Sequence, residues 1–453
     1  MRHTKLALAV LAAAVLSACG GGTSPAGGDQ TNNIKFTNQV SFGDSLSDVG
    51  TYRVGAIAAA GGGKFTINGD SSAKNEDLSG KIWLDFMAAQ LNLPAPCAAQ
   101  TGLQGNAALG FSVPITNNAN CFNYAQGGSR VTDPIGSNNA ATGSPIGALT
   151  TPMVTQIQNH LTKVGGKFTG TELVTVLSGG GDVLMQLASV TNAGTTAGNQ
   201  AFAVALATRL AAGATNPQTA AQAIGAAIAT ESARAGSTQQ SVVQVAIRTA
   251  AGQPGNAAVA QEAVYGPIVA AAQAEGTAAG NTAAGAYATA NATRMVTEMG
   301  AAGAQMAALV RNELVAKGAK YVIVGNLPDV ASTPASKSRP AAIQQLVAAM
   351  VNAFNTQLKA GLGADNAAIL YTDLYSVSND QVKNPGPYGL SNTSAAACGA
   401  NALGTTSLIC TANNTAAGDV SRYMFADDIH PTPFENDLIA RYVLKDMTIK
   451  GWL

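Results

Sequence analysis

Charged side chains are scarce in this sequence of 453 residues, and the two signs balance. Lysine, arginine, aspartate and glutamate make up 11% of the chain, and 25 basic residues are offset by 25 acidic ones. A nucleic-acid-binding surface needs clustered basic residues, and this composition supplies no basic stripe. The sequence therefore predicts no nucleic-acid partner.

Cysteine and histidine are also rare, with five and three residues respectively. No two cysteines have the close spacing of a zinc knuckle, so we expect no metal site. Apart from Cys19, the spacing suggests two local disulfides, Cys97 to Cys121 and Cys398 to Cys410. Four cysteines allow three connectivities, so the other pairings stay open at this point.

Long apolar runs are missing except at the amino terminus. There Arg2 and Lys5 precede an apolar run, 6–16, that is too short to cross a bilayer as a helix. This pattern is typical of an export signal, which we assign to 1–18. Its end, Leu16-Ser17-Ala18-Cys19, resembles the lipobox of bacterial lipoproteins, in which the cysteine is acylated. The alternative is an ordinary cleaved signal with an incidental cysteine.

Residues 19–33 are rich in glycine and polar residues, which is typical of a flexible tether. No later stretch has the length and apolar character of a membrane-spanning helix, so we expect a soluble body that only a lipid on Cys19 attaches to a membrane. The predicted location is the cell envelope, as an outer-membrane lipoprotein or otherwise as a periplasmic or secreted protein.

The rest of the chain alternates short β-type runs with helical patterns, which is typical of an α/β domain. The runs 173–177 and 321–324 are apolar and β-branched, as expected of strands buried on both faces of a parallel sheet, and 367–371 is a weaker third. Apolar residues from Ile343 to Leu358 repeat at helical spacing before Gly361, and a last helix is expected just after Pro433.

Between 191 and 289 the chain is dominated by alanine, glycine, threonine and glutamine. Runs at 201–212, 219–234 and 256–274 predict several short helices, and a further helix is expected from about Met295 to Gly318. We expect an inserted helical subdomain that is a possible lid. The alternative is a low-complexity spacer with little fixed structure, because alanine buries little area per residue.

The stretch FGDSLSDVG (42–50) follows a run in which alternate residues are apolar, so Ser45 is either a nucleophile at a strand end or a turn residue. A serine hydroxyl needs a neighbouring base, most often a histidine oriented by a carboxylate. His160 falls at the edge of an apolar helix face and is expected to be structural. His430 lies in a loop closed by prolines, where functional residues concentrate.

Two aspartates precede His430, and their positions are not equivalent. Asp427, three residues back, can fold over a turn to meet the imidazole, whereas Asp428, two residues back, would point away in an extended chain. Ser45 and the His430 loop can both reach the carboxyl edge of a parallel sheet, where sites form. The sequence therefore predicts a catalytic triad of Ser45, His430 and Asp427.

These stretches together resemble the GDSL or SGNH family of serine hydrolases. FGDSLSDVG (42–50), NYAQGGSR (123–130) and DDIHPT (427–432) are similar to its first, second and last blocks. The resemblance covers about 34–190 and 290–453, which we assign to one hydrolase domain. It implies a three-layer, doubly wound parallel sheet of flavodoxin-like order, with an oxyanion hole that includes the backbone N–H groups of Ser45 and Gly128.

One departure from the family pattern falls in the third block, Gly-x-Asn-Asp, whose asparagine side chain donates to the oxyanion. Here the corresponding stretch is LSGGGDVL (177–184), with Gly181 in place of the asparagine. Loss of such a donor elsewhere costs about 10² to 10³ in turnover, so we expect a slow site rather than a dead one. A hypothesis is that the glycine-rich turn aims an amide of its own. Asp182 is expected to be a turn or cap residue.

The sequence thus predicts an exported serine ester hydrolase that forms an acyl-enzyme and needs no cofactor. Lipid-like, short-acyl and polymeric esters all stay open as substrates. Two alternatives remain: a catalytically impaired surface lipoprotein that binds through the same scaffold, and an acyltransferase that uses an alcohol acceptor.

Overall fold

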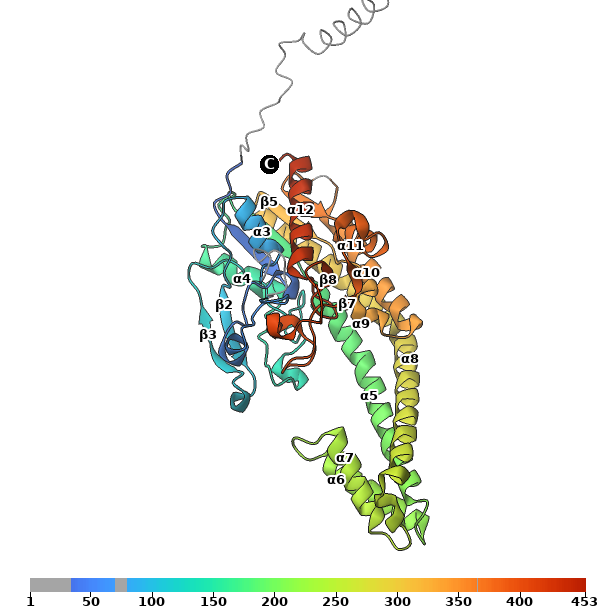
Figure 1. The fold of residues 1–453 in the computed structure, drawn as a ribbon. Coiled ribbons are helices and arrows are strands. Elements are labelled where there is room, and N and C mark those ends of the chain that lie inside the picture. Colours follow the sequence, from blue (N-terminus) through green and yellow to red (C-terminus); the bar gives the residue numbers. More distant parts are fainter. Residues whose placement is uncertain (1–33, 70–79, 365) are drawn as a thin grey trace, which may run out of the picture.

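The computed structural model describes residues 34–69, 80–364 and 366–453. The predicted signal peptide, the lipidation site Cys19 and the tether lie outside the described residues. At the centre of the fold lies a parallel sheet with the strand order β1-β4-β5-β6 (Figure 1). Its strands are β1 (Gln39–Gly43), β4 (Leu173–Leu177), β5 (Tyr321–Gly325) and β6 (Ile369–Thr372). The three strands predicted from apolar runs are confirmed with small shifts at their ends.

The outer edge of β1 carries one further parallel contact. Asn123 forms a parallel bridge with Ser41, since Ser41 N donates to Phe122 O and Tyr124 N donates to Ser41 O. If this bridge is counted as a reduced edge strand, the order becomes 2-1-3-4-5, which is that of doubly wound, flavodoxin-like sheets.

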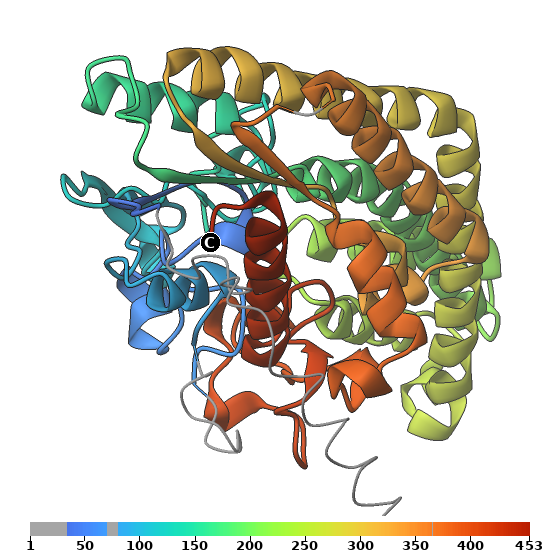
Figure 2. The same cartoon turned by 90° about the horizontal axis from the view of Figure 1, so that it is seen from above.

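Helices cover both faces of the sheet, because alternate side chains of each strand point to opposite sides. On β4, Val174 and Val176 pack in one core cluster, while Leu173 and Leu177 pack in another. The first cluster includes side chains of α4 (Met153–Lys163), α8 (Glu262–Leu309) and α10 (Ala341–Leu362), and the second includes those of α3 (Trp83–Gln90) and α12 (Pro433–Lys450). Figure 2 shows these helices on either side of the strands. The expected α/β class, with a parallel sheet and flanking helices, is confirmed.

Smaller elements surround the carboxyl edge of the sheet. The smaller elements are α2 (Gly55–Ala59), β2 (Gln100–Gln104), β3 (Ser112–Asn117), α9 (Pro334–Lys337), α11 (Leu374–Lys383), β7 (Asn392–Ala396) and β8 (Tyr423–Phe425). Among them, β2 and β3 form an antiparallel pair, and β7 pairs with β8.

The alanine-rich region forms an arm of two long and two shorter helices (Figure 1). They are α5 (Gly180–Ala211), α6 (Pro217–Ser232), α7 (Gln239–Ala251) and α8. The expectation of several short helices is wrong for the run 201–212, which is the end of α5, and for most of 256–274, in which a short 3-10 helix (Ala257–Ala260) is followed by the start of α8. The helix expected from Met295 begins at Glu262 instead. The predicted boundaries at 191 and 289 fall inside α5 and α8, and the division of the chain at these points stays a prediction.

Small residues explain how so alanine-rich an arm packs. Gly194 and Gly198 of α5 lie against Gly276 and Gly280 of α8, where an added Cβ would lie 2.9 to 3.0 Å from a carbonyl oxygen of the facing helix. The two backbones therefore approach closely along this contact. The far end of the arm has a core of its own, in which Phe202, Leu206 and Ile224 are buried. Alanine has the highest helix propensity, which accounts for the uninterrupted length of both helices.

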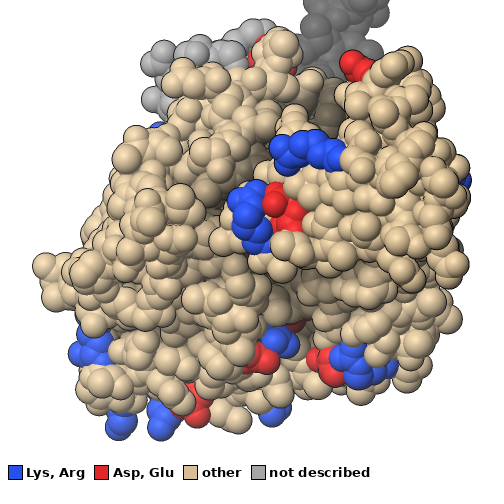
Figure 3. Space-filling model, turned by 90° about the horizontal axis from the view of Figure 1, so that it is seen from below, with Lys and Arg blue, Asp and Glu red and all other residues tan. Residues whose placement is uncertain are grey.

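The surface reflects the low content of charged residues. Figure 3 shows a face on which Lys, Arg, Asp and Glu are few and scattered. Within the part of the chain that the structure describes, no helix combines the length and hydropathy required to cross a membrane.

Candidate active site

The strand β1 ends at Gly43, two residues before Ser45. All five residues of β1 are buried, and the last, Gly43, has a φ of +152°. A Cβ on Gly43 would lie 2.0 Å from the carbonyl oxygen of Leu177 on β4, so only glycine permits this approach. Asp44 then caps the short 3-10 turn Ser45–Ser47, because its carboxylate accepts from Leu46 N at 3.2 Å.

Asp44 also ties this turn to the start of α5. Its second carboxylate oxygen accepts from Gly180 N at 2.9 Å. This amide belongs to the glycine-rich turn for which the sequence suggests an oxyanion donor, and it is bound to Asp44. Burial raises the pKa of Asp44 to about 6, although the two backbone hydrogen bonds act to lower it.

His430 comes from the loop between β8 and α12. The loop folds back on itself, since Phe425 bridges Pro431 and Ala426 N donates to His430 O at 2.7 Å. Asp427 closes the turn inside it by accepting from the backbone N–H groups of Ile429 and His430 at 2.9 and 2.7 Å. The three-residue spacing therefore folds over a turn, as the sequence predicts.

The structure brings Ser45, His430 and Asp427 together in one chain of hydrogen bonds. His430 Nε2 lies 2.9 Å from Ser45 Oγ, and His430 Nδ1 lies 2.8 Å from Asp427 Oδ2. Asp428 does not join this chain: its side chain is exposed. A hydroxyl, an imidazole and a carboxylate in this order have the arrangement of a serine-nucleophile triad.

Two opposing effects set the protonation of His430. Burial favours the neutral imidazole, but the charge and hydrogen bonds of Asp427 outweigh it, so the pKa of His430 is raised above its ordinary value. Burial likewise disfavours the Asp427 carboxylate, but the His430 charge and the donated hydrogen bonds hold the pKa of Asp427 well below its usual range. Asp427 is thus ionised beside a histidine that can accept a proton.

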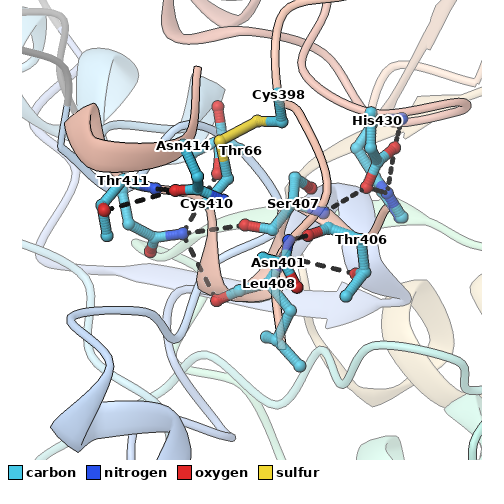
Figure 4. Close-up of a disulfide and its surroundings, with 12 residues drawn as sticks. Thr66, Cys398, Asn401, Thr406, Ser407, Leu408, Cys410, Thr411, Asn414 and His430 are labelled. Atoms are coloured by element: carbon cyan, nitrogen blue, oxygen red, sulfur yellow. Dashed lines mark hydrogen bonds and ion pairs between the residues drawn. A yellow bond between two sulfur atoms is a disulfide. The ribbon is translucent and has the colours of Figure 1, made fainter. Parts of the chain in front are cut away.

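Sequence reasoning missed two residues that hold this pair. Ser407 N donates to Asp427 Oδ2 at 2.7 Å, and Phe65 places its ring centroid 4.9 Å from that of His430. Ser407 lies within the loop closed by the disulfide Cys398–Cys410, and Figure 4 shows this disulfide with Ser407 and His430 nearby. Neither residue belongs to a motif, so their roles depend on contacts between segments far apart in sequence.

The other pair of cysteines is joined as well, in a disulfide between Cys97 and Cys121. It lies at the β1 edge, where Asn123 N donates to Cys97 O at 3.2 Å. Both local pairings suggested by the spacing are therefore the ones that the structure forms.

Gly128 lies in a loop that is bound to the Ser45 segment on both sides. Gly127 N donates to the Asp48 carboxylate at 2.8 Å, and Ser129 Oγ donates to Gly43 O at 2.7 Å. Gly128 itself has a φ of +82°, and a Cβ there would lie 2.3 Å from Ser137 O. The loop thus requires glycine at 128, and its neighbours fix it beside the end of β1.

Gly181 lies in the first turn of α5, pressed against the same loop. A Cβ at this position would lie 2.1 Å from Ser129 O and 2.9 Å from Gly128 O. The space for an asparagine side chain is therefore filled by backbone. Asp182 forms an ion pair with Arg130 at 3.0 Å and accepts from Val131 N, so its contacts are structural.

His160 is buried, as a structural histidine would be. It lies within 3.3 Å of the Tyr124 hydroxyl, and its ring packs on Phe168 with centroids 4.8 Å apart. Burial lowers the pKa of His160 to about 4, so it stays neutral near neutral pH.

An apolar cavity of about 90 Å³ opens beside Ser45. We call it the Ser45 cavity. Its walls come from several elements around the carboxyl edge of the sheet, and they include Leu46, Trp83, Leu184, Leu327, Val377 and Met424. No sequence pattern indicates this cavity, because these residues become neighbours only in the fold.

We predict that Gly181→Asn destabilises the protein and lowers ester turnover, instead of restoring a missing donor. The added side chain must displace the Gly128–Ser129 backbone, and such overpacking costs roughly 1–3 kcal/mol. Gly225→Asn, on an open face of α6 with no atom within 4 Å of the added Cβ, is the matched control. Its free energy of unfolding in urea should change by less than about 0.5 kcal/mol. Faster turnover with unchanged stability in Gly181→Asn would contradict this account.

Several curated proteins similar to this chain are named as esterases, most of them as GDSL esterase/lipases. One GDSL esterase/lipase of Arabidopsis thaliana, At1g58430, is 28% identical over 153 residues, which are 31% of this chain and 41% of the relative. A second, At2g40250, is 35% identical over 79 residues, or 17% of this chain and 22% of the relative. The esterase EstA of Pseudomonas aeruginosa is 31% identical over 131 residues, or 27% of this chain and 19% of the relative.

These matches cover less than half of each relative, and no family model matches the chain. At modest identity they agree in one respect, since every one of these relatives bears the name of an esterase or a GDSL esterase/lipase. The similarities therefore support the GDSL superfamily and, in general terms, an ester hydrolase.

Proposed function

We propose that this protein is an exported serine ester hydrolase that works through an acyl-enzyme on Ser45. The single observation that carries the proposal is the hydrogen-bonded chain from Ser45 Oγ to His430 Nε2 and from His430 Nδ1 to Asp427, at 2.9 and 2.8 Å. The GDSL esterase relatives support the same chemistry.

In the proposed reaction Ser45 Oγ attacks the acyl carbonyl carbon while its proton passes to His430 Nε2. Asp427 stabilises the imidazolium that forms. The C–O bond to the alcohol then breaks, and the alcohol leaves with the proton from His430. Water, deprotonated by His430, then attacks the acyl carbon. The bond to Ser45 Oγ breaks, the carboxylic acid leaves, and Ser45 Oγ takes the proton back from His430. We assign stabilisation of the oxyanion to the backbone N–H groups of Ser45 and Gly128, with no side chain at Gly181.

The proposal includes export and a lipid anchor at Cys19. These two parts of it depend on the amino-terminal sequence pattern alone. It also treats 191–289 as a lid or acyl-binding surface of the hydrolase domain. Two observations place the first turns of α5, which lead into 191–289, near the substrate: α5 starts directly after β4 at the edge of the sheet that carries Ser45, and Leu184 of α5 lines the Ser45 cavity.

We predict that Ser45→Ala abolishes both labelling by a fluorophosphonate and hydrolysis of p-nitrophenyl esters. The loss in kcat should reach at least about 10⁴-fold, because the remaining triad residues act only through the nucleophile. Ser47→Ala is the matched control, since the Ser47 hydroxyl is buried without a partner two residues away. It should keep both activities.

Three outcomes would contradict the proposal. Labelling that persists in Ser45→Ala would place the nucleophile elsewhere. A wild-type protein that is neither labelled nor active on any ester would favour a binding lipoprotein. Transfer of the acyl group to an added alcohol, in place of hydrolysis, would favour an acyltransferase that uses the same residues.

We predict that kcat/KM rises with pH through an apparent pKa above 6.5, the ordinary value for histidine. His430 must be neutral to accept the Ser45 proton, and Asp427 raises the pKa of His430, so activity is lost as the pH falls through that raised value. Asp427→Asn should lower this apparent pKa and reduce kcat by about 10⁴-fold. Asp428→Asn, which leaves the His430 partner in place, should keep the wild-type profile. An unchanged apparent pKa in Asp427→Asn would exclude Asp427 as the partner of the base.

A further inference from the structure

The Ser45 cavity lies on the acyl side of the proposed reaction. Ser45 lines the cavity, but His430 does not. In acyl transfer the leaving alcohol takes its proton from the histidine and must therefore lie beside it. The part of the ester that remains on Ser45 is the acyl group, so this is the part that the cavity is placed to hold.

A buried polar pair interrupts the apolar wall of this cavity. Gln381 of α11 and Glu435 in the first turn of α12 both line it, and they are only 2% and 3% exposed. Gln381 Nε2 donates to Glu435 Oε2 at 3.0 Å, while Gln381 Oε1 has no partner. Leaving a buried polar atom without a partner is costly, so a ligand group that bonds to Gln381 would be favoured at this place in the wall.

The other polar side chains that line the cavity are bonded within the protein. Asn436 accepts from Trp83 N at 3.0 Å, Asp329 accepts from Asn379 at 2.7 Å, and Ser378 accepts from Asp329 N at 2.9 Å. Among the cavity-lining residues that the structure describes, Gln381 alone has a buried side-chain atom without a partner.

The pair matches a hydroxyl group. Burial raises the pKa of Glu435 to about 8, so near neutral pH its carboxyl group is mostly protonated and has an O–H to donate. Together Glu435 and Gln381 then offer one donor and one acceptor, and a hydroxyl has both. If the oxygen and nitrogen of the Gln381 amide are exchanged, the amide oxygen accepts from the protonated Glu435 carboxyl group. The amide nitrogen is then the atom without a partner. A charged ligand group would be disfavoured by the apolar surroundings.

We propose that the Ser45 cavity binds the acyl chain of hydroxyacyl esters, with the chain hydroxyl bonded between Gln381 and Glu435. This inference rests on the proposed ester hydrolysis at Ser45 and narrows its substrate class. An unsubstituted chain in the same place would leave the Gln381 carbonyl buried without a partner. The enzyme should therefore prefer the hydroxylated chain of matched length.

The test compares p-nitrophenyl esters of butanoic, hexanoic and octanoic acids with their 3-hydroxybutanoic, 6-hydroxyhexanoic and 8-hydroxyoctanoic counterparts. For at least one length, wild type should favour the hydroxyacyl ester in kcat/KM by about tenfold, the effect of one or two net hydrogen bonds. In Gln381→Leu/Glu435→Leu this preference should disappear and turnover of the unsubstituted ester should rise. Replacing both members of a hydrogen-bonded pair by apolar groups is tolerated far better than removing one member, so we expect the double variant to fold. Its thermal unfolding curve verifies this.

Val377→Ala is the control, because it shortens an apolar side chain of the cavity wall and keeps both polar side chains, so it should change both esters of a length by the same factor. Equal rates for hydroxylated and unsubstituted esters in wild type, or a preference that survives in the double variant, would overturn the inference while the proposed hydrolysis stands. If the wild-type protein hydrolyses none of these esters, the proposed function itself is contradicted.

A binding measurement separates the two proposals further. Trp83 lies in the cavity wall, so its fluorescence can report binding. Methyl 6-hydroxyhexanoate and methyl hexanoate are each titrated into the Ser45→Ala variant, which cannot hydrolyse them. The hydroxylated ester should bind at least about fivefold more tightly than the unsubstituted one. If both esters saturate the fluorescence change with equal affinity, the inference is overturned by a measurement that involves no catalysis.

Discussion

The geometry of the site depends on one buried carboxylate, that of Asp427. It accepts from Ser407 N, Ile429 N, His430 N and His430 Nδ1. A buried charge is stable only when it is paired and hydrogen-bonded, and here the donors come from two segments, Ser407 and the pair Ile429–His430. Because the carboxylate has a fixed place, the imidazole ring of His430 has a fixed direction, and its Nε2 meets Ser45 Oγ. The bond that results joins residues 385 positions apart in the chain.

The opposite side of the site depends on close approach of backbones. Gly43, Gly128 and Gly181 each lie where a Cβ would come within 2.3 Å of a carbonyl oxygen. These glycines let the end of β1, the loop at 127–129 and the start of α5 meet beside Ser45. Gly181 is therefore part of a packing arrangement in which the backbone fills the place of a family side chain.

Much of the fold follows from local pattern, and the rest needs tertiary contacts. The strands 173–177 and 321–324 are recognisable because two-sided burial demands a continuous apolar run. The two long arm helices are not recognisable, since glycines at 194, 198, 276 and 280 read as breaks until the facing helix is known. Ser45, His430 and Asp427 can be proposed from spacing and motif. Phe65, Ser407, Gln381 and Glu435 cannot, because each acts through a partner remote in sequence.

The proposed reaction requires that Ser45 carry the acyl group during turnover. Its most direct test is to mix the wild-type protein with an excess of p-nitrophenyl hexanoate, quench in acid within milliseconds, and locate the added acyl mass by peptide mass spectrometry. The account predicts a hexanoyl group on the peptide that contains Ser45, formed together with a burst of p-nitrophenol. Hexanoyl on another residue, or turnover without any acylated peptide, would contradict it.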